Sequence, residues 1–173
     1  HNILNSMACA VVCLYLGMNP EEMAEHIDKF PGAGRRFEIL GEVNGVTIAD
    51  DYAHHPTEIA ATLKAAKEMD FHEVWAVFQP FTYSRTALLM DDFVTALSVA
   101  DHVVMSEIMG SREKNTYNIY TRDLAEKIPG SVWFNTFKEM ADYTMSHAKP
   151  GDLVITLGCG DVYKCAYIMA GID

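Results

Sequence analysis

Short apolar segments that alternate with amphipathic ones constrain the fold of this chain more than any other feature. A strand that is apolar on both faces is buried on both sides, which is typical of parallel sheets covered by helices. The alternation therefore predicts an α/β domain with a Rossmann-like, three-layer architecture and a mostly parallel sheet. The expected strands are 46–50, 73–78, 102–106, 131–134 and 152–157, and the expected helices are 56–69, 84–98, 121–128, 136–147 and 161–170.

The first thirty residues have a different pattern. Residues 4–16 predict a mostly apolar helix, and a second helix is expected from Pro20 to about Lys29. The sequence opens at His1 without an initiator methionine, and the helical pattern begins at once. We therefore expect the chain to be a piece of a longer protein.

The stretch Pro31-Gly32-Ala33-Gly34 is the clearest break in the pattern. We place a domain boundary there, with residues 1–31 as the helical end of a preceding domain and residues 32–173 as the α/β domain. Just after the break, the turn pair Asn44-Gly45 lies between two apolar segments and predicts a β-hairpin over residues 37–51.

The composition argues against several classes of protein. The 13 basic and 24 acidic residues give a net charge of −11, whereas a nucleic-acid-binding protein needs a basic face. No apolar segment reaches the length of a membrane span, and the charge balance suits a soluble, cytoplasmic protein. The four cysteines lack CxxC spacing and are expected to be buried thiols, so we expect no structural zinc site and no metal ligands here.

The densest group of polar side chains is Asp50-Asp51-Tyr52-Ala53-His54-His55-Pro56, between an expected strand and an expected helix. Ligands of parallel sheets bind beyond the carboxyl ends of the strands. Carboxylates hold ribose hydroxyls or a metal ion, and imidazoles donate to a carboxylate or accept from an amine. Any one of these residues could be a helix cap or a surface residue, but five polar groups in seven positions indicate a site.

Two further groups carry arginines. The segment from Phe78 to Thr86 contains Arg85, whose guanidinium could bind a substrate carboxylate with two hydrogen bonds. Alternatively, Ser84 caps a helix and Arg85 lies in solvent. The pair Arg35-Arg36 follows two glycines and suits phosphate groups, although an exposed basic linker explains it equally well.

The two ends of the chain give weaker signals. Asn2 and Asn5 share one helix face, and their carboxamides match the donor and the acceptor of an adenine edge, although helix capping is the simpler explanation. The segment Gly158-Cys159-Gly160-Asp161 looks like half of a dinucleotide-binding motif but lacks the third glycine. It predicts a tight turn in which Asp161 caps the last helix. The sequence contains no GxxxxGK[ST] phosphate-binding loop.

The order of these motifs resembles the Mur ligase family over essentially the whole chain: HNxxN, GAGRRFE, DDYAHHPTEI, FQPxxYSRT and GCGD. The resemblance implies a three-domain, ATP-dependent ligase of peptidoglycan synthesis. It implies UDP-N-acetylmuramic acid and L-alanine as substrates, with the muramyl carboxylate activated as an acyl phosphate that the amine attacks. ATP and Mg²⁺ would be bound mainly by a central domain, of which this chain would hold only the last helices.

The resemblance also implies roles for individual residues on the nucleotide side and on the amino-acid side of a cleft. Since the phosphate loop and the magnesium ligands are missing, we expect the chain by itself to lack ligase activity. The nucleotide-side residues are Asn2 and Asn5 near adenine, Arg36 near the phosphates and Asp51 near the ribose. The amino-acid-side residues are Tyr52, His54, His55 and Arg85. The predicted catalytic residues are Arg36, His54 and His55.

One departure from the family pattern concerns the amino acid. Many members have His-Arg after FQP, whereas this chain has Phe81-Thr82. The resemblance implies that these two polar groups hold the alanine carboxylate, so the change leaves Arg85 for that role.

Other interpretations stay open at this point. A sister ligase that attaches a preformed peptide to the same sugar shares the fold and the histidine loop. A dinucleotide-binding oxidoreductase domain would carry an early GxGxxG, which the sequence lacks. An interaction module would give no reason for His, Asp and Arg to gather at neighbouring strand ends. Residues 107–120 are expected to form a mobile loop at the cleft, without assigned partners.

Overall fold

The computed structural model describes residues 2–29 and 33–172, with side chains described from Leu4 onward in these ranges. The chain divides into two compact units, residues 1–33 and 34–173, which are described separately below. The predicted boundary at Pro31-Gly32 lies outside the described residues, and the assignment of residues 1–31 to a preceding domain stays a prediction.

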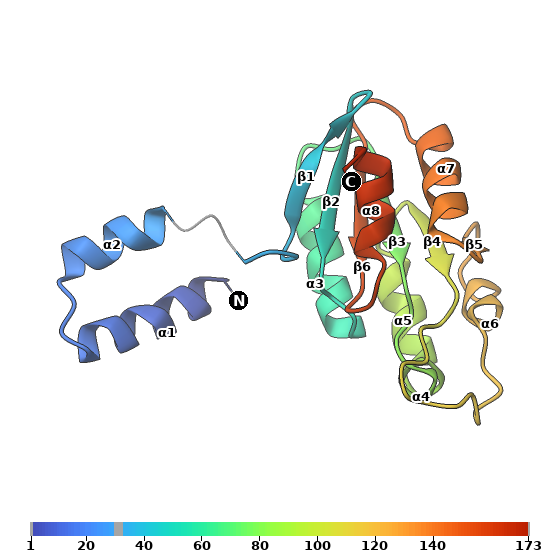
Figure 1. Cartoon of the computed structure of the whole chain (residues 1–173), viewed down its shortest axis with the longest axis horizontal. Helices are drawn as coiled ribbons and strands as arrows, with labels where there is room; N and C mark the ends of the chain where they lie inside the picture. Colours follow the sequence, from blue (N-terminus) through green and yellow to red (C-terminus); the bar gives the residue numbers. More distant parts are fainter. Residues whose placement is uncertain (1, 30–32, 173) are drawn as a thin grey trace. The chain divides into compact units, whose positions relative to one another are not determined.

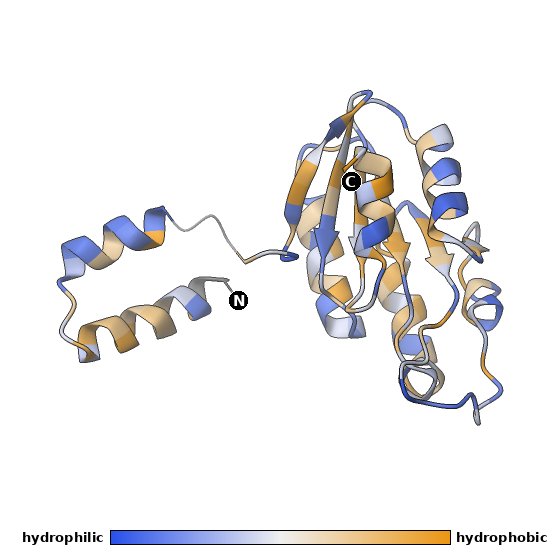
Figure 2. Ribbon diagram, in the orientation of Figure 1, coloured by the Kyte–Doolittle hydropathy of each residue, from blue (hydrophilic) through white to orange (hydrophobic). Residues whose placement is uncertain are grey.

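The first unit is a pair of helices, α1 (Asn2–Tyr15) and α2 (Pro20–Asp28), close to the predicted ranges. The helix α2 begins where the Asn19 side chain accepts a hydrogen bond of 2.8 Å from the Glu21 backbone, with Pro20 in its first turn. Much of the α1 ribbon is coloured as hydrophobic (Figure 2). Apolar side chains of α1 are nevertheless exposed, and Val11 and Tyr15 are 66% and 89% exposed. This pair alone therefore does not bury the apolar face of α1.

The second unit contains a six-stranded sheet in the order β1-β2-β6-β3-β4-β5 (Figure 1). Only β1 is antiparallel to its neighbour, and the other strands are parallel, as predicted. The strands are β1 (Glu38–Val43), β2 (Val46–Asp51), β3 (Val74–Phe78), β4 (His102–Ser106), β5 (Val132–Phe134) and β6 (Leu153–Leu157).

Helices cover both faces of this sheet, which confirms the three-layer α/β class. One apolar core joins the sheet to α3, α5 and α6, and a second joins the opposite face to α7 and α8. The helices are α3 (Pro56–Lys67), α4 (Tyr83–Leu88), α5 (Met90–Leu97), α6 (Thr121–Ala125), α7 (Phe137–His147) and α8 (Tyr163–Ala170).

The strand β3 shows why the apolar segments are continuous and not alternating. Its residues Ala76 and Phe78 face the core under α3 and α5, whereas Trp75 and Val77 face the core under α7 and α8. Phe78 also packs against Phe93 of α5, with ring centroids 5.4 Å apart. Because both faces are buried, both sets of positions must be apolar.

Three expectations were wrong in detail. The helix expected over 84–98 is two helices, because Leu89 leaves helical geometry between α4 and α5. Asp161 does not cap α8, whose N-cap is Val162; its carboxylate lies 3.2 Å from the Lys164 ammonium instead. Of the four cysteines, only Cys165 is buried.

The two edges of the sheet are short or irregular. The pairing of β1 with β2 shifts register between Ile39 and Gly41, and Glu38 and Glu42 of β1 are exposed. At the other edge, β5 has only three residues. No helix in the described part of the chain is long and apolar enough to span a membrane.

The core under α5 gives a direct test of the packing. Phe93 is fully buried, so Phe93→Ala should lower the free energy of unfolding by ~3–5 kcal/mol through lost transfer energy and a cavity. Leu88→Ala, at a side chain that is 74% exposed, should change it by less than ~0.5 kcal/mol. Urea denaturation of the two variants measures both values, and equal losses would contradict the described packing.

Candidate functional site

The carboxyl ends of β3 and β6 form the topological switch point of the sheet. These strands are neighbours, but the chain after β3 leads to α5 on one face and the chain after β6 leads to α8 on the other. Ligands of doubly wound folds bind at such a point. The loops of interest are therefore those after β2, β3 and β6.

Gln79, just after β3, joins the loops after β3 and β6. Its carboxamide oxygen accepts a hydrogen bond of 2.9 Å from the backbone of Asp161. A Cβ at Gly160 would overlap that carboxamide and would lie only 2.6 Å from the sulfur of Met109. The three loops therefore approach closely at Gly160, and a larger residue there would displace the side chains of Gln79 and Met109.

Arg35 ties the start of the α/β unit to the loop after β6. Its Nε donates to the buried Asp50 carboxylate at 2.6 Å, and one Nη donates to the Gly158 carbonyl at 2.7 Å. The guanidinium also lies over the rings of Tyr52 and Tyr163, 5.1 and 4.8 Å from their centroids. The other Nη donates to the Gly160 carbonyl at 3.4 Å, and these contacts within the chain give Arg35 a structural role.

Asp51, at the end of β2, is 5% exposed. One carboxylate oxygen accepts from the Ala53 backbone at 2.7 Å and the other from the Phe37 backbone at 2.8 Å. Burial raises the pKa of Asp51, although these two donors and the charge of Arg36 act in the opposite direction. The geometry thus shows a carboxylate that shapes two loops, and its predicted contact with ribose stays a prediction.

The two histidines of the loop bond locally. The His55 ring accepts from the Thr57 backbone at 3.3 Å and forms the N-cap of α3, with Glu58 completing a capping box. The His54 Nδ1 lies 3.0 Å from the Tyr52 carbonyl and 3.4 Å from the Glu58 carboxylate. These contacts fix both imidazoles, and their predicted catalytic and substrate-binding roles stay predictions.

Arg36 differs from its neighbour Arg35. It is exposed and forms no side-chain hydrogen bond with the described part of the chain, and its guanidinium lies 5.7 Å from the centroid of the Tyr52 ring. The Tyr52 ring is therefore flanked by both arginines. Arg36 is the one whose donors are available to an anionic ligand.

Arg85, in the first turn of α4, also has free bonding capacity. Its Nη1 is buried and has no hydrogen-bond partner in the structure. Its charge also acts on the loop after β6. Burial raises the pKa of the Cys159 thiol in that loop, and the positive charge of Arg85 acts in the opposite direction. An unpaired, partly desolvated guanidinium is suited to a carboxylate ligand.

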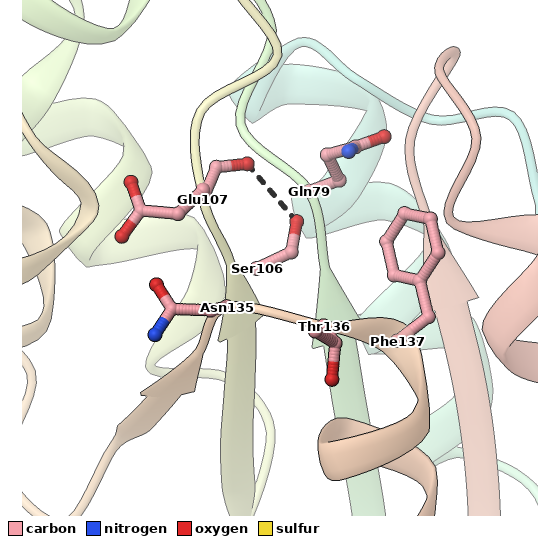
Figure 3. Close-up of a pocket in the computed structure, with 6 residues that line it drawn as sticks. All are labelled: Gln79, Ser106, Glu107, Asn135, Thr136 and Phe137. Atoms are coloured by element: carbon pink, nitrogen blue, oxygen red, sulfur yellow. Dashed lines mark hydrogen bonds between the residues drawn. The ribbon is translucent and has the colours of Figure 1, made fainter.

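A polar pocket of about 290 Å³ lies at the carboxyl ends of β3, β4 and β5 (Figure 3). The Ser106 hydroxyl donates to the Glu107 carbonyl at 3.1 Å. The carboxylate of Glu107 and the carboxamide of Asn135 lie on one side of the pocket, whereas the Gln79 carboxamide points to the opposite side. The pocket adjoins the switch point through Gln79 and is also lined by Thr136 and Phe137.

The first unit is described by itself. Asn5 lines a groove between α1 and α2, together with Cys9 and His26. The side chain of Asn2 lies outside the described residues, so the predicted adenine contacts of Asn2 and Asn5 stay predictions. Within the described ranges, no three His, Cys, Asp or Glu side chains are grouped so that they could hold a metal ion.

Most of the predicted residues of the second unit lie at the edge of the sheet where the parallel strands end. Asp51 ends β2, the histidine loop follows it, and Arg85 lies in α4 after β3, whereas Arg36 lies beside Tyr52 of the histidine loop. The role of Glu58, which accepts from the backbones of His54 and His55, was not predicted. The pair Arg35-Arg36 indicated both arginines, but the sequence could not show which guanidinium forms hydrogen bonds within the chain and which stays exposed.

An α/β domain with acidic and basic loops at the carboxyl ends of its parallel strands belongs to the ligand-binding, doubly wound class. Within that class, the chain belongs to the Mur ligase family. The family described as "Mur ligase, glutamate ligase domain" matches residues 35–160.

Individual relatives agree with this membership. The chain is 44% identical over 168 residues to a UDP-N-acetylmuramate–L-alanine ligase of Acetivibrio thermocellus, covering 95% of this chain and 36% of the relative. A solved UDP-N-acetylmuramate-alanine ligase of Thermotoga maritima aligns with a TM-score of 0.78 and 25% identity, covering 99% of this chain and 37% of the other. A murein peptide ligase of Psychrobacter arcticus aligns with a TM-score of 0.71 and 23% identity, covering 99% of this chain and 36% of the other, and shares the fold. The chain thus spans little more than a third of the length of these relatives.

The capping box at α3 predicts a dependence of stability on pH. Burial alone would raise the pKa of Glu58, but the backbone donors of His54 and His55, followed by the charges of His54 and Arg36, outweigh burial and lower it. Its contribution to the free energy of unfolding is therefore complete above its ordinary pKa of 4.5 and is lost as the pH falls through the lower, folded pKa.

We expect Glu58→Gln to lower the stability at neutral pH and to reduce the loss of stability on acidification. Urea denaturation at neutral pH and at several pH values below 4.5 measures this slope. Glu68→Gln, at the other end of α3, is the matched control and should keep the slope of the unmodified chain. An unchanged slope in Glu58→Gln would show that the capping carboxylate does not titrate as described.

Proposed function

We propose that this chain is the C-terminal part of a UDP-N-acetylmuramate–L-alanine ligase. In this proposal the complete enzyme forms the amide bond between the carboxylate of UDP-N-acetylmuramic acid and the amine of L-alanine, with ATP, in peptidoglycan synthesis. The observation that carries it is the free bonding capacity of Arg36 and Arg85 at the carboxyl edge of a Mur ligase fold. The 44% identity to an alanine-adding relative supports the choice of amino acid.

In the same proposal, residues 1–31 are the end of the central, ATP-binding domain. The support is the exposed apolar surface of α1, which includes Val11 and Tyr15 and is suited to packing against further protein. The parts of the site that activate ATP would then be supplied elsewhere in the complete enzyme. The acidic net charge agrees with the cytoplasmic location that belongs to the proposal.

The nucleotide side of the site rests on Arg36. Its guanidinium is exposed, uses none of its donors on the described chain, and lies beside an aromatic ring, so it fits a polyphosphate. In the complete enzyme, bound ATP would supply the phosphoryl group that activates the carboxylate, with Mg²⁺ held mainly outside this chain. Arg36 would neutralise charge that develops on that group. Asp51 would hold the two loops that its hydrogen bonds join, and its carboxylate oxygens would accept hydrogen bonds from the ribose hydroxyls.

The amino-acid side rests on Arg85. A carboxylate of the amino acid would satisfy the buried Nη1, which lacks a partner in the structure. Tyr52, His54 and His55 lie in the loop after β2 and would form the opposite wall, with the amine directed toward the activated carboxylate. Holding the amine in this geometry is the main contribution that such a domain makes to the rate.

The acceptor assay separates this function from its nearest rival. The complete enzyme, supplied with ATP, Mg²⁺ and UDP-N-acetylmuramic acid, should release phosphate with L-alanine and should give the muramyl-alanine product by mass spectrometry. The isolated chain is the control and should form none. Product with a preformed tripeptide, and none with L-alanine, would instead identify the peptide-adding sister ligase.

Substitution of Arg36 tests the nucleotide side. Arg36→Ala in the complete enzyme should lower kcat by about 10²–10³, the typical cost of removing one donor that stabilises developing charge. Arg122→Ala, at an exposed arginine on α6, is the control and should leave kcat near that of the unmodified enzyme. A kcat of Arg36→Ala close to normal would rule out the assigned role.

A further inference from the structure

The Glu113 carboxylate forms three hydrogen bonds that link the loop after β4 to the segment that carries Arg85. One oxygen accepts from the hydroxyls of Thr82 and Ser84 at 2.7 and 2.6 Å, and the other accepts from the Ser84 backbone at 2.9 Å. The Ser84 hydroxyl donor and the Ser84 backbone donor, followed by Thr82, lower the pKa of Glu113, so the carboxylate is ionised at neutral pH.

These bonds replace a cap that α4 lacks. The N-cap residue Thr82 makes no capping hydrogen bond with its own side chain, and the first backbone donors of a helix need partners. Glu113 supplies a charged acceptor from a different loop, which also suits the positive end of the helix. The start of α4, and with it the third residue of the helix, Arg85, is therefore held from outside the helix.

The loop that carries Glu113 is itself firmly attached. The Met109 backbone donates to the Pro80 carbonyl at 2.9 Å, and Phe81 and Met109 form a parallel bridge that extends the pairing of β3 with β4. A Cβ at Gly110 would overlap the ring of Tyr83, so the backbone lies directly against that ring. A turn closed by the Glu113 backbone on the Gly110 carbonyl, at 2.9 Å, then presents the carboxylate.

Arg85 lies close enough for its charge to lower the pKa of Glu113, yet it forms no salt bridge with any residue in the described ranges. Glu113 binds the neighbours of Arg85 instead of Arg85 itself. The backbone that carries Arg85 is thus held at the start of α4, while the buried Nη1 stays available.

We propose that Glu113 is a positioning residue for the amino-acid substrate, which holds Thr82 and Ser84 so that Arg85 is presented to the substrate carboxylate. This inference rests on the proposed function. It also gives Thr82 a role: its hydroxyl is a ligand of the Glu113 carboxylate, at a position where many family members have arginine.

The test is a kinetic comparison in the complete ligase. Glu113→Gln keeps the size of the side chain but loses the charge and one acceptor oxygen. It should raise KM for L-alanine about tenfold, since hydrogen bonds to a charged group are lost, and should leave KM for ATP within about twofold. Glu126→Gln, at an exposed carboxylate directly after α6, is the matched control and should leave both constants unchanged.

A double-variant cycle shows whether Glu113 acts through Arg85. The forked guanidinium is already absent in Arg85→Lys. Adding Glu113→Gln to that variant should therefore raise KM for L-alanine by less than about twofold relative to Arg85→Lys alone. An unchanged KM for L-alanine in Glu113→Gln, an equal rise for both substrates, or a full second effect in the double variant would overturn the proposal. A parent enzyme that forms no muramyl-alanine would overturn the proposed function itself, and this inference with it.

Discussion

The ion pair of Arg35 with Asp50 is the contact on which the arrangement of the candidate site depends. Asp50 is 1% exposed, and a buried carboxylate without a partner carries a large desolvation cost. The Arg35 guanidinium binds one oxygen of Asp50, and the Thr156 hydroxyl donates to the other at 2.6 Å. The same guanidinium binds carbonyls of the loop after β6. The entry to the α/β unit, the end of β2 and the loop after the last strand are therefore fixed together, and Arg36 is left with its side chain in solvent.

The three arginines near the strand ends divide two tasks. Arg35 neutralises a buried acid, whereas Arg36 and Arg85 retain donors for ligands. The contrast matters because the chain carries a net charge of −11. Under the proposed function, an anionic substrate would be attracted by these local cations and not by the molecule as a whole. A buried donor without a partner, as in Arg85, lowers stability in the absence of ligand, which is a common cost at sites that bind charged groups.

The fold could be predicted from the sequence because buried parallel strands leave a continuous apolar signal, and the hairpin because Asn44-Gly45 is a specific turn pair. The break at Leu89 could not, since neither glycine nor proline marks it and tertiary packing decides where the helix ends. In the site, His55 is the N-cap of α3. The sequence allowed this role, because His55 directly precedes Pro56 at the expected start of the helix. Glu113 carried no signal, because its partners are about thirty residues away and its loop has no periodic pattern.

The irregular edges of the sheet disfavour the addition of a strand from a second molecule. A strand from a second molecule that approached β1 would meet a shifted register and the exposed carboxylates of Glu38 and Glu42. At the opposite edge, the three residues of β5 offer too few backbone groups to hold a guest strand. The same antiparallel β1 that covers β2 thus acts as a barrier to intermolecular sheet growth, and the central strands can be almost wholly apolar without making the domain prone to aggregation.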